Sequence, residues 1–287
     1  MRAIPDLRNL FPSPRGRRAG ARLASALCLA LALASCKSYS NDVTGSINPA
    51  VQTPSSPDAA RLYVQQWGQR YAADPNDKTV AMNYALALHG TKQYAQAVAV
   101  LEKLAIRNSS DLNVLGAYGK ALADDGRLQE AARVLANAHT PARPNWTILS
   151  AQGNVADLLG DHATAQDFYK AALRIAPGQP SLLSNLGLSY ALSKQLPKAE
   201  KVLREAAAKP QANSRVRQNL ALVLALRGKF AEAEAIDRQD LPAAQAAANV
   251  MAVRNMIAQS NTWKQIQQSS PQPAKTPGTK ARSHSSG

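Results

Sequence analysis

The chain is poor in cysteine, in aromatic residues and in acidic residues. Among its 287 residues are two cysteines, aromatics make up 5%, and 34 lysines and arginines outnumber 19 aspartates and glutamates. Two cysteines exclude a disulfide-rich scaffold, and the scarcity of aromatic and β-branched residues argues against a sheet. The hydrophobic fraction of 45%, dominated by alanine and leucine, is enough for a sizeable core and favours helices. We therefore expect an all-α protein.

The sequence also lacks the motifs of common enzymes. It has no phosphate-binding loop, no Gly-x-Ser-x-Gly elbow and no dinucleotide fingerprint. The four histidines are scattered without metal-ligand spacing: His89, His139, His162 and His284. The acidic neighbours Asp124 and Asp125 fall at an expected surface turn, where solvated carboxylates do no chemistry. We expect no catalysis, no metal, no cofactor and no small-molecule substrate.

The excess of positive charge is spread along the chain. Six arginines and one aspartate within residues 1–35 contribute +5 of the formal +15, which leaves +10 for the rest. A nucleic-acid binder would gather its basic residues on one element, interleaved with aromatics. Here they occur singly, as at Lys92, Lys103, Lys120, Arg133 and Lys170. We expect a solvated surface and no nucleic-acid partner, with attraction to acidic partners or anionic envelope surfaces as the alternative.

An uncharged run of thirteen residues, 23–35, follows the arginine-rich start. A membrane-spanning helix needs about 20 apolar residues, so this run is too short and is typical of a secretory signal. The residues that follow, Leu33-Ala34-Ser35-Cys36, resemble a lipobox, whose cysteine is acylated and becomes the mature N-terminus. Cys28 follows the bulky Leu27 and would leave with the signal. The alternative is an ordinary cleaved signal that leaves Cys36 as a free thiol.

Lipidation at Cys36 predicts a protein without disulfides that is held at the cell envelope by its acyl chains. Lysine rather than aspartate follows this cysteine. In enterobacterial lipoproteins that pattern directs sorting to the outer membrane, so we expect the periplasmic face of the outer membrane. The inner membrane stays open as the alternative.

A pattern with a period of 34 residues runs from Lys78 to about Leu241. One column of the pattern is alanine in all five copies: Ala97, Ala131, Ala165, Ala199 and Ala233. A second small column lies twelve residues upstream: Ala85, Gly119, Gly153, Gly187 and Ala221. Four residues after the alanine lie Leu101, Leu135, Tyr169, Leu203 and Asp237. Antiparallel helices approach closely only where one offers a small residue to the other's bulky side chain, so we predict five helix pairs.

The period and its columns resemble the tetratricopeptide repeat, which implies a right-handed superhelical solenoid of helix-turn-helix units. His162 stands where other copies have tyrosine, leucine or phenylalanine, which favours a packing role over metal ligation. The fifth unit is degenerate, as terminal units often are, since Arg217, Asp237 and Asp240 replace mostly apolar or small residues. The predicted units are residues 78–111, 112–145, 146–179, 180–213 and 214–241.

The remaining segments differ in composition from the repeats. Residues 1–35 are the predicted signal, and residues 36–57 are rich in Ser, Thr, Asn, Pro and Gly, as in a flexible tether. We expect an N-terminal helix within 58–77, a capping helix over 242–267 and a disordered basic tail over 268–287.

In tetratricopeptide arrays the first helix of each pair lines a groove that holds an extended peptide or a partner helix. The residues expected to face it are Asn83, Asn113, Lys120, Asn154, Asn185, Gln218 and Asn219. A row of amides can both donate hydrogen bonds to an extended backbone and accept them from it. Alternatively, Asn83, Asn185 and Asn219 are common at their place in the repeat and serve neighbouring loops.

The C-terminal stretch is the most distinctive part of the chain. It includes Arg227-Gly228-Lys229-Phe230-Ala231-Glu232-Ala233-Glu234, Asp240-Leu241-Pro242 and Asn261-Thr262-Trp263-Lys264. With the lipobox and the repeats, it resembles the TadD family, the lipoproteins of the tight-adherence (Flp, type IVb) pilus machinery of proteobacteria. The resemblance covers about Cys36 to Gln267.

Membership of that family implies an outer-membrane assembly factor that helps the secretin pore to form, as pilotins do. Its partners would be the pilus secretin or other Flp pilus assembly proteins, bound non-covalently through the repeat groove. Two alternatives remain. One is a different lipid-anchored periplasmic adaptor for outer-membrane or peptidoglycan assembly, and the other is an accessory that recruits substrate to a separate enzyme.

Overall fold

The computed structural model describes residues 56–269, with side chains as far as Ser260. Within this range the chain forms twelve helices and no β-strand, apart from an isolated bridge between Thr140 and Arg143. The all-α prediction is therefore confirmed. The predicted signal, the lipidation site Cys36, nearly all of the tether, His284 and the tail beyond residue 269 lie outside the described residues.

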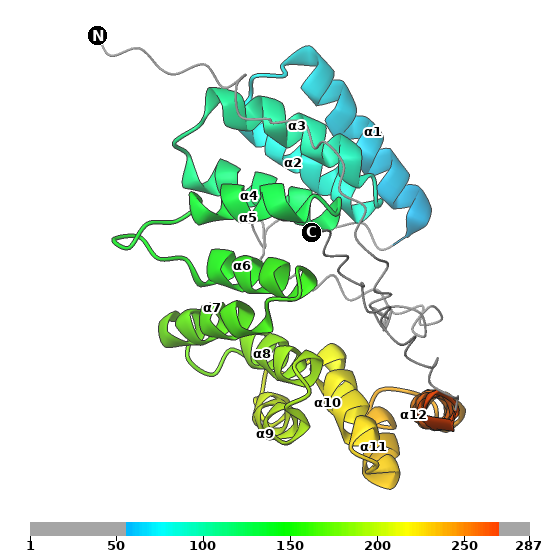
Figure 1. The fold of residues 1–287 in the computed structure, drawn as a ribbon. Coiled ribbons are helices and arrows are strands. Elements are labelled where there is room, and N and C mark those ends of the chain that lie inside the picture. Colours follow the sequence, from blue (N-terminus) through cyan, green and yellow to red (C-terminus); the bar gives the residue numbers. More distant parts are fainter. Residues whose placement is uncertain (1–55, 270–287) are drawn as a thin grey trace, which may run out of the picture. The chain divides into compact units, whose positions relative to one another are not determined.

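Five helix pairs follow one another along the chain (Figure 1). Their first helices are α2 (Lys78–Gly90), α4 (Leu112–Asp124), α6 (Trp146–Leu158), α8 (Pro180–Leu192) and α10 (Ser214–Leu226). Their second helices are α3 (Tyr94–Arg107), α5 (Leu128–Ala136), α7 (His162–Ile175), α9 (Leu196–Ala207) and α11 (Phe230–Asp237). The helix α1 (Pro57–Ala73) precedes the pairs and α12 (Ala243–Ser269) follows them. Each second helix packs against the first helix of its own pair and that of the next, or against α12 after the last pair.

Short polar residues fix where the first helices begin. The side chains of Asp77, Asp111, Asn145 and Asn213 each accept a hydrogen bond from a backbone N–H in the first turn of α2, α4, α6 and α10. These bonds satisfy donors that a helix start otherwise leaves open. Between α6 and α7 the chain reverses at Gly160, whose φ of +84° is readily adopted only by glycine.

The small columns lie where the helices of a pair touch. A Cβ added to Gly119 would come within 2.7 Å of Leu135, one on Gly153 within 2.6 Å of the Tyr169 ring, and one on Gly187 within 2.6 Å of Leu203. Each contact joins the second small column to the apolar column of the same pair. The sequence therefore predicted the register of helix packing correctly.

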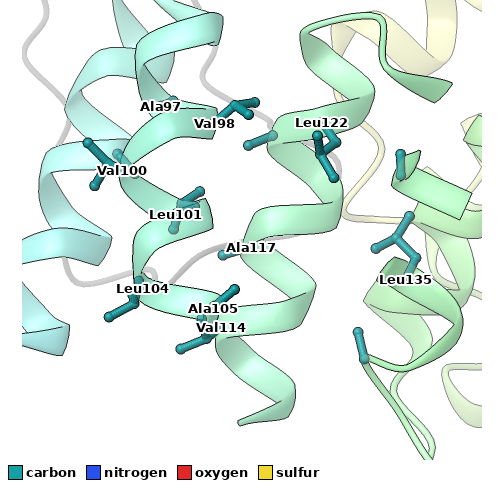
Figure 2. Close-up of a cluster of buried hydrophobic side chains, with 14 of the residues drawn as sticks. Ala97, Val98, Val100, Leu101, Leu104, Ala105, Val114, Ala117, Leu122 and Leu135 are labelled. Atoms are coloured by element: carbon teal, nitrogen blue, oxygen red, sulfur yellow. The ribbon is translucent and has the colours of Figure 1, made fainter. Parts of the chain in front are cut away.

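The core continues from one pair to the next. Figure 2 shows Leu101 and Leu104 of α3, Val114 and Leu122 of α4, and Leu135 of α5 contributing to one buried cluster. Because the second helices from α3 to α9 each touch two first helices, buried apolar clusters extend across the boundaries between units. A unit of this kind cannot bury its apolar face alone, so its stability depends on its neighbours.

The last pair carries an acid at its centre. Asp237 occupies the column that holds Leu203 in the preceding pair, and only 4% of it is exposed. Its Oδ2 accepts a hydrogen bond from Asn249 of α12 at 3.2 Å, whereas its Oδ1 is buried without a hydrogen-bond partner. Burial raises the pKa of Asp237 and the nearby Asp240 adds to this, although the bond from Asn249 opposes it.

We expect Asp237→Leu to stabilise the fold by roughly 1–2 kcal/mol at neutral pH, because it removes a buried and half-satisfied carboxylate. When folding raises the pKa of an acid, the acid makes its most favourable contribution to the free energy of unfolding below its unfolded pKa. This contribution is lost as the pH rises through the folded pKa. The increase in stability of Asp237→Leu over the wild type should therefore become smaller when the pH is lowered to about 4. Urea unfolding of both proteins at the two pH values measures this. A leucine variant that is less stable at neutral pH would contradict the prediction.

Candidate partner-binding surface

The first helices lie next to one another. Each contacts the first helix of the following pair, from α2 through α4, α6 and α8 to α10. Within residues 56–269, by contrast, the backbones of successive second helices lie farther apart, and α9 and α11 are joined through the side chains of Arg204 and Glu232. The first helices thus form a row, and their solvent-facing side chains make one continuous surface.

The residues on this surface can be identified from helix periodicity, because residues that are seven or eleven positions apart lie on the same face of a helix. We call it the first-helix surface. It comprises Asn113 and Lys120 of α4, Asn154 and Leu158 of α6, Leu188 and Leu192 of α8, and Leu222 and Leu226 of α10.

The polar half of the first-helix surface lies on α4 and α6. Asn113 and Asn154 are exposed, and Lys120 is half-buried between the two helices. The Lys120 Nζ donates to the Thr147 hydroxyl of α6 at 3.4 Å. Burial lowers the pKa of Lys120 to about 8, and Asp124 partly opposes this shift. The ammonium therefore stays largely charged at neutral pH, in a position that favours an anionic group nearby.

The apolar half lies on α6, α8 and α10. Leu158 is 57% exposed and Leu192 is 49% exposed, and they stand at the same place in consecutive units. Leu188, Leu222 and Leu226 are half-buried beside them. Sequence reasoning missed this half, although leucines 34 residues apart on a polar helix face were the available signal. An aligned row of exposed leucines offers area to an apolar partner segment.

Three of the predicted groove amides have hydrogen-bond partners inside the protein. The Nδ2 of Asn185 donates to the Ser150 hydroxyl at 3.2 Å, and that of Asn219 donates to the Ser184 hydroxyl at 2.9 Å. Both bonds join neighbouring first helices across 35 residues of sequence. The side chain of Asn83 donates to a backbone carbonyl of its own helix.

Only some of the seven residues predicted to line the groove make these internal hydrogen bonds. Gln218 is half-buried near the end of the row, and Asn113 and Asn154 are exposed. Asn185 and Asn219 therefore contribute to the contact between units. The partner-binding role of all seven residues stays a prediction.

A serine, a histidine and an aspartate meet between the third and fourth pairs. His162 Nδ1 lies 2.8 Å from Asp157 Oδ1, and the fully buried Ser189 donates to that same oxygen at 2.8 Å. A catalytic triad needs the hydroxyl to bond to the imidazole rather than to the carboxylate. The cluster instead ties α6, α7 and α8 together. No group of acidic, histidine or cysteine side chains among the described residues could hold a metal ion.

Comparisons with known proteins identify the repeats. Residues 158–218 match a family described as tetratricopeptide repeat. The structure is also similar to PilW, a widely conserved type IV pilus biogenesis factor, with a TM-score of 0.59 and 16% identity over 68% of this chain and 91% of that one. The five helix pairs thus have the fold of a tetratricopeptide-repeat solenoid, and residues 158–218 match the repeat family itself. The earlier resemblance is confirmed at this level.

Two further solved structures share the fold. The thermophilic protein TTC0263 from Thermus thermophilus has a TM-score of 0.51 and 22% identity over 63% of this chain and 97% of that one. A chain of the APC/C hetero-tetramer Cut9–Hcn1 has a TM-score of 0.53 and 17% identity over 67% of this chain and 40% of that one.

A curated relative is the co-chaperone sgt12 of Aspergillus fumigatus, which is 33% identical over 129 residues. The match covers 45% of this chain and 34% of that protein, so it spans about a third of the relative's length. Among the tetratricopeptide helices and the two that flank them, none is long and apolar enough to cross a membrane.

Proposed function

We propose that the protein is a lipid-anchored scaffold of the Flp (tight-adherence) pilus machinery, which binds a secretin segment or another pilus assembly protein through its first-helix surface. Tetratricopeptide repeats mediate protein–protein interaction. The observation that carries the proposal is the row of first helices, which exposes one continuous surface with a polar and an apolar half.

The chemistry of that surface describes the expected partner. Exposed Asn113 and Asn154 can hydrogen-bond an extended backbone, and Lys120 favours an acidic side chain or a terminal carboxylate. Leu158 and Leu192 favour apolar side chains at the other end of the same segment. We therefore expect a partner segment with an acidic end and an apolar end.

Three features support the pilus assignment. The C-terminal stretch resembles the TadD family, the lipobox ending at Cys36 would place the repeats at the envelope, and the fold is similar to that of a type IV pilus biogenesis factor. A secretin pore is a large envelope assembly, and an anchored repeat scaffold can hold one of its segments without any covalent chemistry.

Deletion of the gene should abolish surface pili and reduce secretin multimers in the envelope. Restoring the wild-type gene should restore both, whereas Cys36→Ala should restore them only partly, because the repeats would no longer be held at the membrane. Electron microscopy of pili and immunoblots of unheated envelopes measure the two outcomes. Normal pili and normal multimers in the deletion strain would refute the pilus role.

A pair of matched substitutions tests the surface itself. Leu158→Asp places a charge on the exposed apolar half, and Ile106→Asp makes the same change in the last turn of α3, where Ile106 is 75% exposed. We expect only Leu158→Asp to weaken pilus assembly and secretin capture in cross-linked envelopes. If both variants assembled pili and captured the secretin equally well, the first-helix surface would not be the partner-binding surface. Capture of a peptidoglycan enzyme or an outer-membrane assembly protein in place of a secretin would favour the alternative adaptors.

A further inference from the structure

Within residues 56–269, the helix α1 has the place of a second helix, and no first helix precedes it. It ends at Ala73, which lies 34 residues before the end of α3 at Arg107. The same shift relates Tyr63, Trp67 and Arg70 of α1 to three residues of α3 that are almost fully buried: Ala97, Leu101 and Leu104. In α1, therefore, two aromatic rings and a guanidinium stand where the regular units have small and apolar residues.

Among the helices that the structure describes, none covers the face that bears these three residues. Within residues 56–269, α2 is the single helix that packs against α1, and it does so through Val64, Gly68 and Tyr71. Tyr63 and Trp67 remain half-buried.

Trp67 lies between the other two side chains and contacts both of them. The Tyr63 and Trp67 rings meet edge to face with centroids 6.1 Å apart, and the Arg70 guanidinium lies 4.7 Å from the centre of a Trp67 ring. On the neighbouring strip of the helix, Leu62 is 58% exposed.

The opposite end of the array differs in the side chains that the structure describes, which extend as far as Ser260. In α12, the register of the repeats places Asn255 in the column that holds Gly187 and Ala221, and Arg254 and Asn255 are exposed. An end helix can thus present polar residues to solvent. The repeat register alone therefore does not require aromatic residues on the outer face of an end helix.

The composition of this face fits a phospholipid surface. Tryptophan and tyrosine concentrate at the level of lipid headgroups, because their rings are apolar and their N–H or O–H groups stay wet. Arginine binds phosphate with several donors while its stem covers apolar surface. Leu62 adds an apolar side chain that can reach the acyl boundary.

The position of α1 in the chain agrees with this occupant. Ser56 stands twenty positions after Cys36, so even a fully extended segment keeps the start of α1 within about 70 Å of a lipidated cysteine. This step rests on the lipid anchor of the proposed function. We propose that α1 is a membrane-docking helix, whose Tyr63, Trp67 and Arg70 lie in the headgroup layer of the leaflet that carries the Cys36 lipid.

The test follows Trp67 fluorescence in protein purified from envelopes with its native N-terminus and reconstituted into phosphatidylethanolamine and phosphatidylglycerol vesicles. One variant keeps Trp67 as the single tryptophan, with Trp146→Phe and Trp263→Phe. The matched control keeps Trp146 of α6 instead. Because an interfacial helix lies about 5–10 Å into the lipid, lipids brominated near the top of the acyl chains should quench Trp67 several-fold more than Trp146. Arg70→Glu should reduce the quenching of Trp67.

Each outcome decides the proposal. Unquenched Trp67 that stays open to aqueous acrylamide would overturn it. Trp67 that is shielded from acrylamide but not quenched by brominated lipid would also overturn it, because another protein segment or a second copy would then cover the face. Mass spectrometry of the same preparation separates this inference from the proposed function. A lipidated protein with unquenched Trp67 refutes docking alone, normal pili in the deletion strain refute the pilus role alone, and absence of the lipid refutes the anchor on which both depend.

Discussion

Gly153→Val is expected to lower the free energy of unfolding by about 3 kcal/mol, because a side chain at this position overlaps a buried ring. A Cβ on Gly153 would lie 2.6–2.9 Å from three atoms of the Tyr169 ring, and Tyr169 is only 2% exposed. The ring cannot move aside without opening the core between α6 and α8. Urea unfolding followed by circular dichroism measures the loss.

The matched control is Gly90→Val at the end of α2. A Cβ on Gly90 meets nothing within 4 Å, and the residue is exposed. Helix propensity alone changes stability by a few tenths of a kcal/mol here, so the control should stay within about 0.5 kcal/mol of the wild type. Equal losses at both positions would contradict the view that small residues in the column are required for close helix packing.

Glu200→Gln should destabilise the protein by roughly 2–3 kcal/mol, because it removes the anion at the centre of a three-cation cluster. Glu200 of α9 is 5% exposed and accepts hydrogen bonds from Arg204 of the same helix and from Arg227 and Lys229 in the turn between α10 and α11. Arg204 also pairs with Glu232 of α11 at 2.6 Å. The cluster thus joins the fourth pair to the fifth. The three cations are partly solvated, which keeps the loss below that of a fully buried pair.

The same carboxylate makes stability depend on pH. Burial by itself would raise the pKa of Glu200, but the bonds from Lys229, Arg204 and Arg227 outweigh it and lower the pKa to about 2. Because folding lowers this pKa, the ionised Glu200 stabilises the folded protein. The stabilisation is fully present above the unfolded pKa of about 4.5 and is lost as the pH falls toward 2. The difference in the free energy of unfolding between the wild type and Glu200→Gln should therefore become smaller as the pH falls from about 4.5 toward 2.

An exposed ion pair supplies the control for the charge change. Lys170 and Asp167 pair at 3.1 Å on the surface of α7, where the Asp167 side chain is 78% exposed. Asp167→Asn should change stability by less than about 0.5 kcal/mol, because surface pairs contribute little. If Glu200→Gln were as mild as Asp167→Asn at neutral pH, the cluster would not be what holds the last two pairs together.

The repeat architecture was predictable because close packing constrains residue size at fixed intervals. Gly153 had to be small because Tyr169 fills the space beside it, and this requirement recurs every 34 residues. Asp237 was recognised as a departure from the pattern. Its burial was not predictable, because α12 covers it from a part of the chain that lies outside the repeat period.

The candidate site was less predictable, because the periodicity assigns a residue to a helix face but does not reveal its neighbours. Asn185 and Asn154 share a type and a nearby helical position, yet Asn185 bonds to Ser150 on the first helix of the preceding pair whereas Asn154 is exposed. The offset between two helices decides this, and it follows only from their packed geometry. The exposure of Leu158 and Leu192 likewise follows from the packed geometry.

The most direct test of the account is site-specific photo-cross-linking in intact envelopes. A photoreactive amino acid replaces Asn154 on the first-helix surface or, in the control, the exposed Lys170 on the second helix α7. The account predicts a cross-link from position 154 to the secretin or to another Flp pilus assembly protein, and none from position 170. A pilus protein captured from position 170 alone, or no pilus protein captured from position 154, would contradict it.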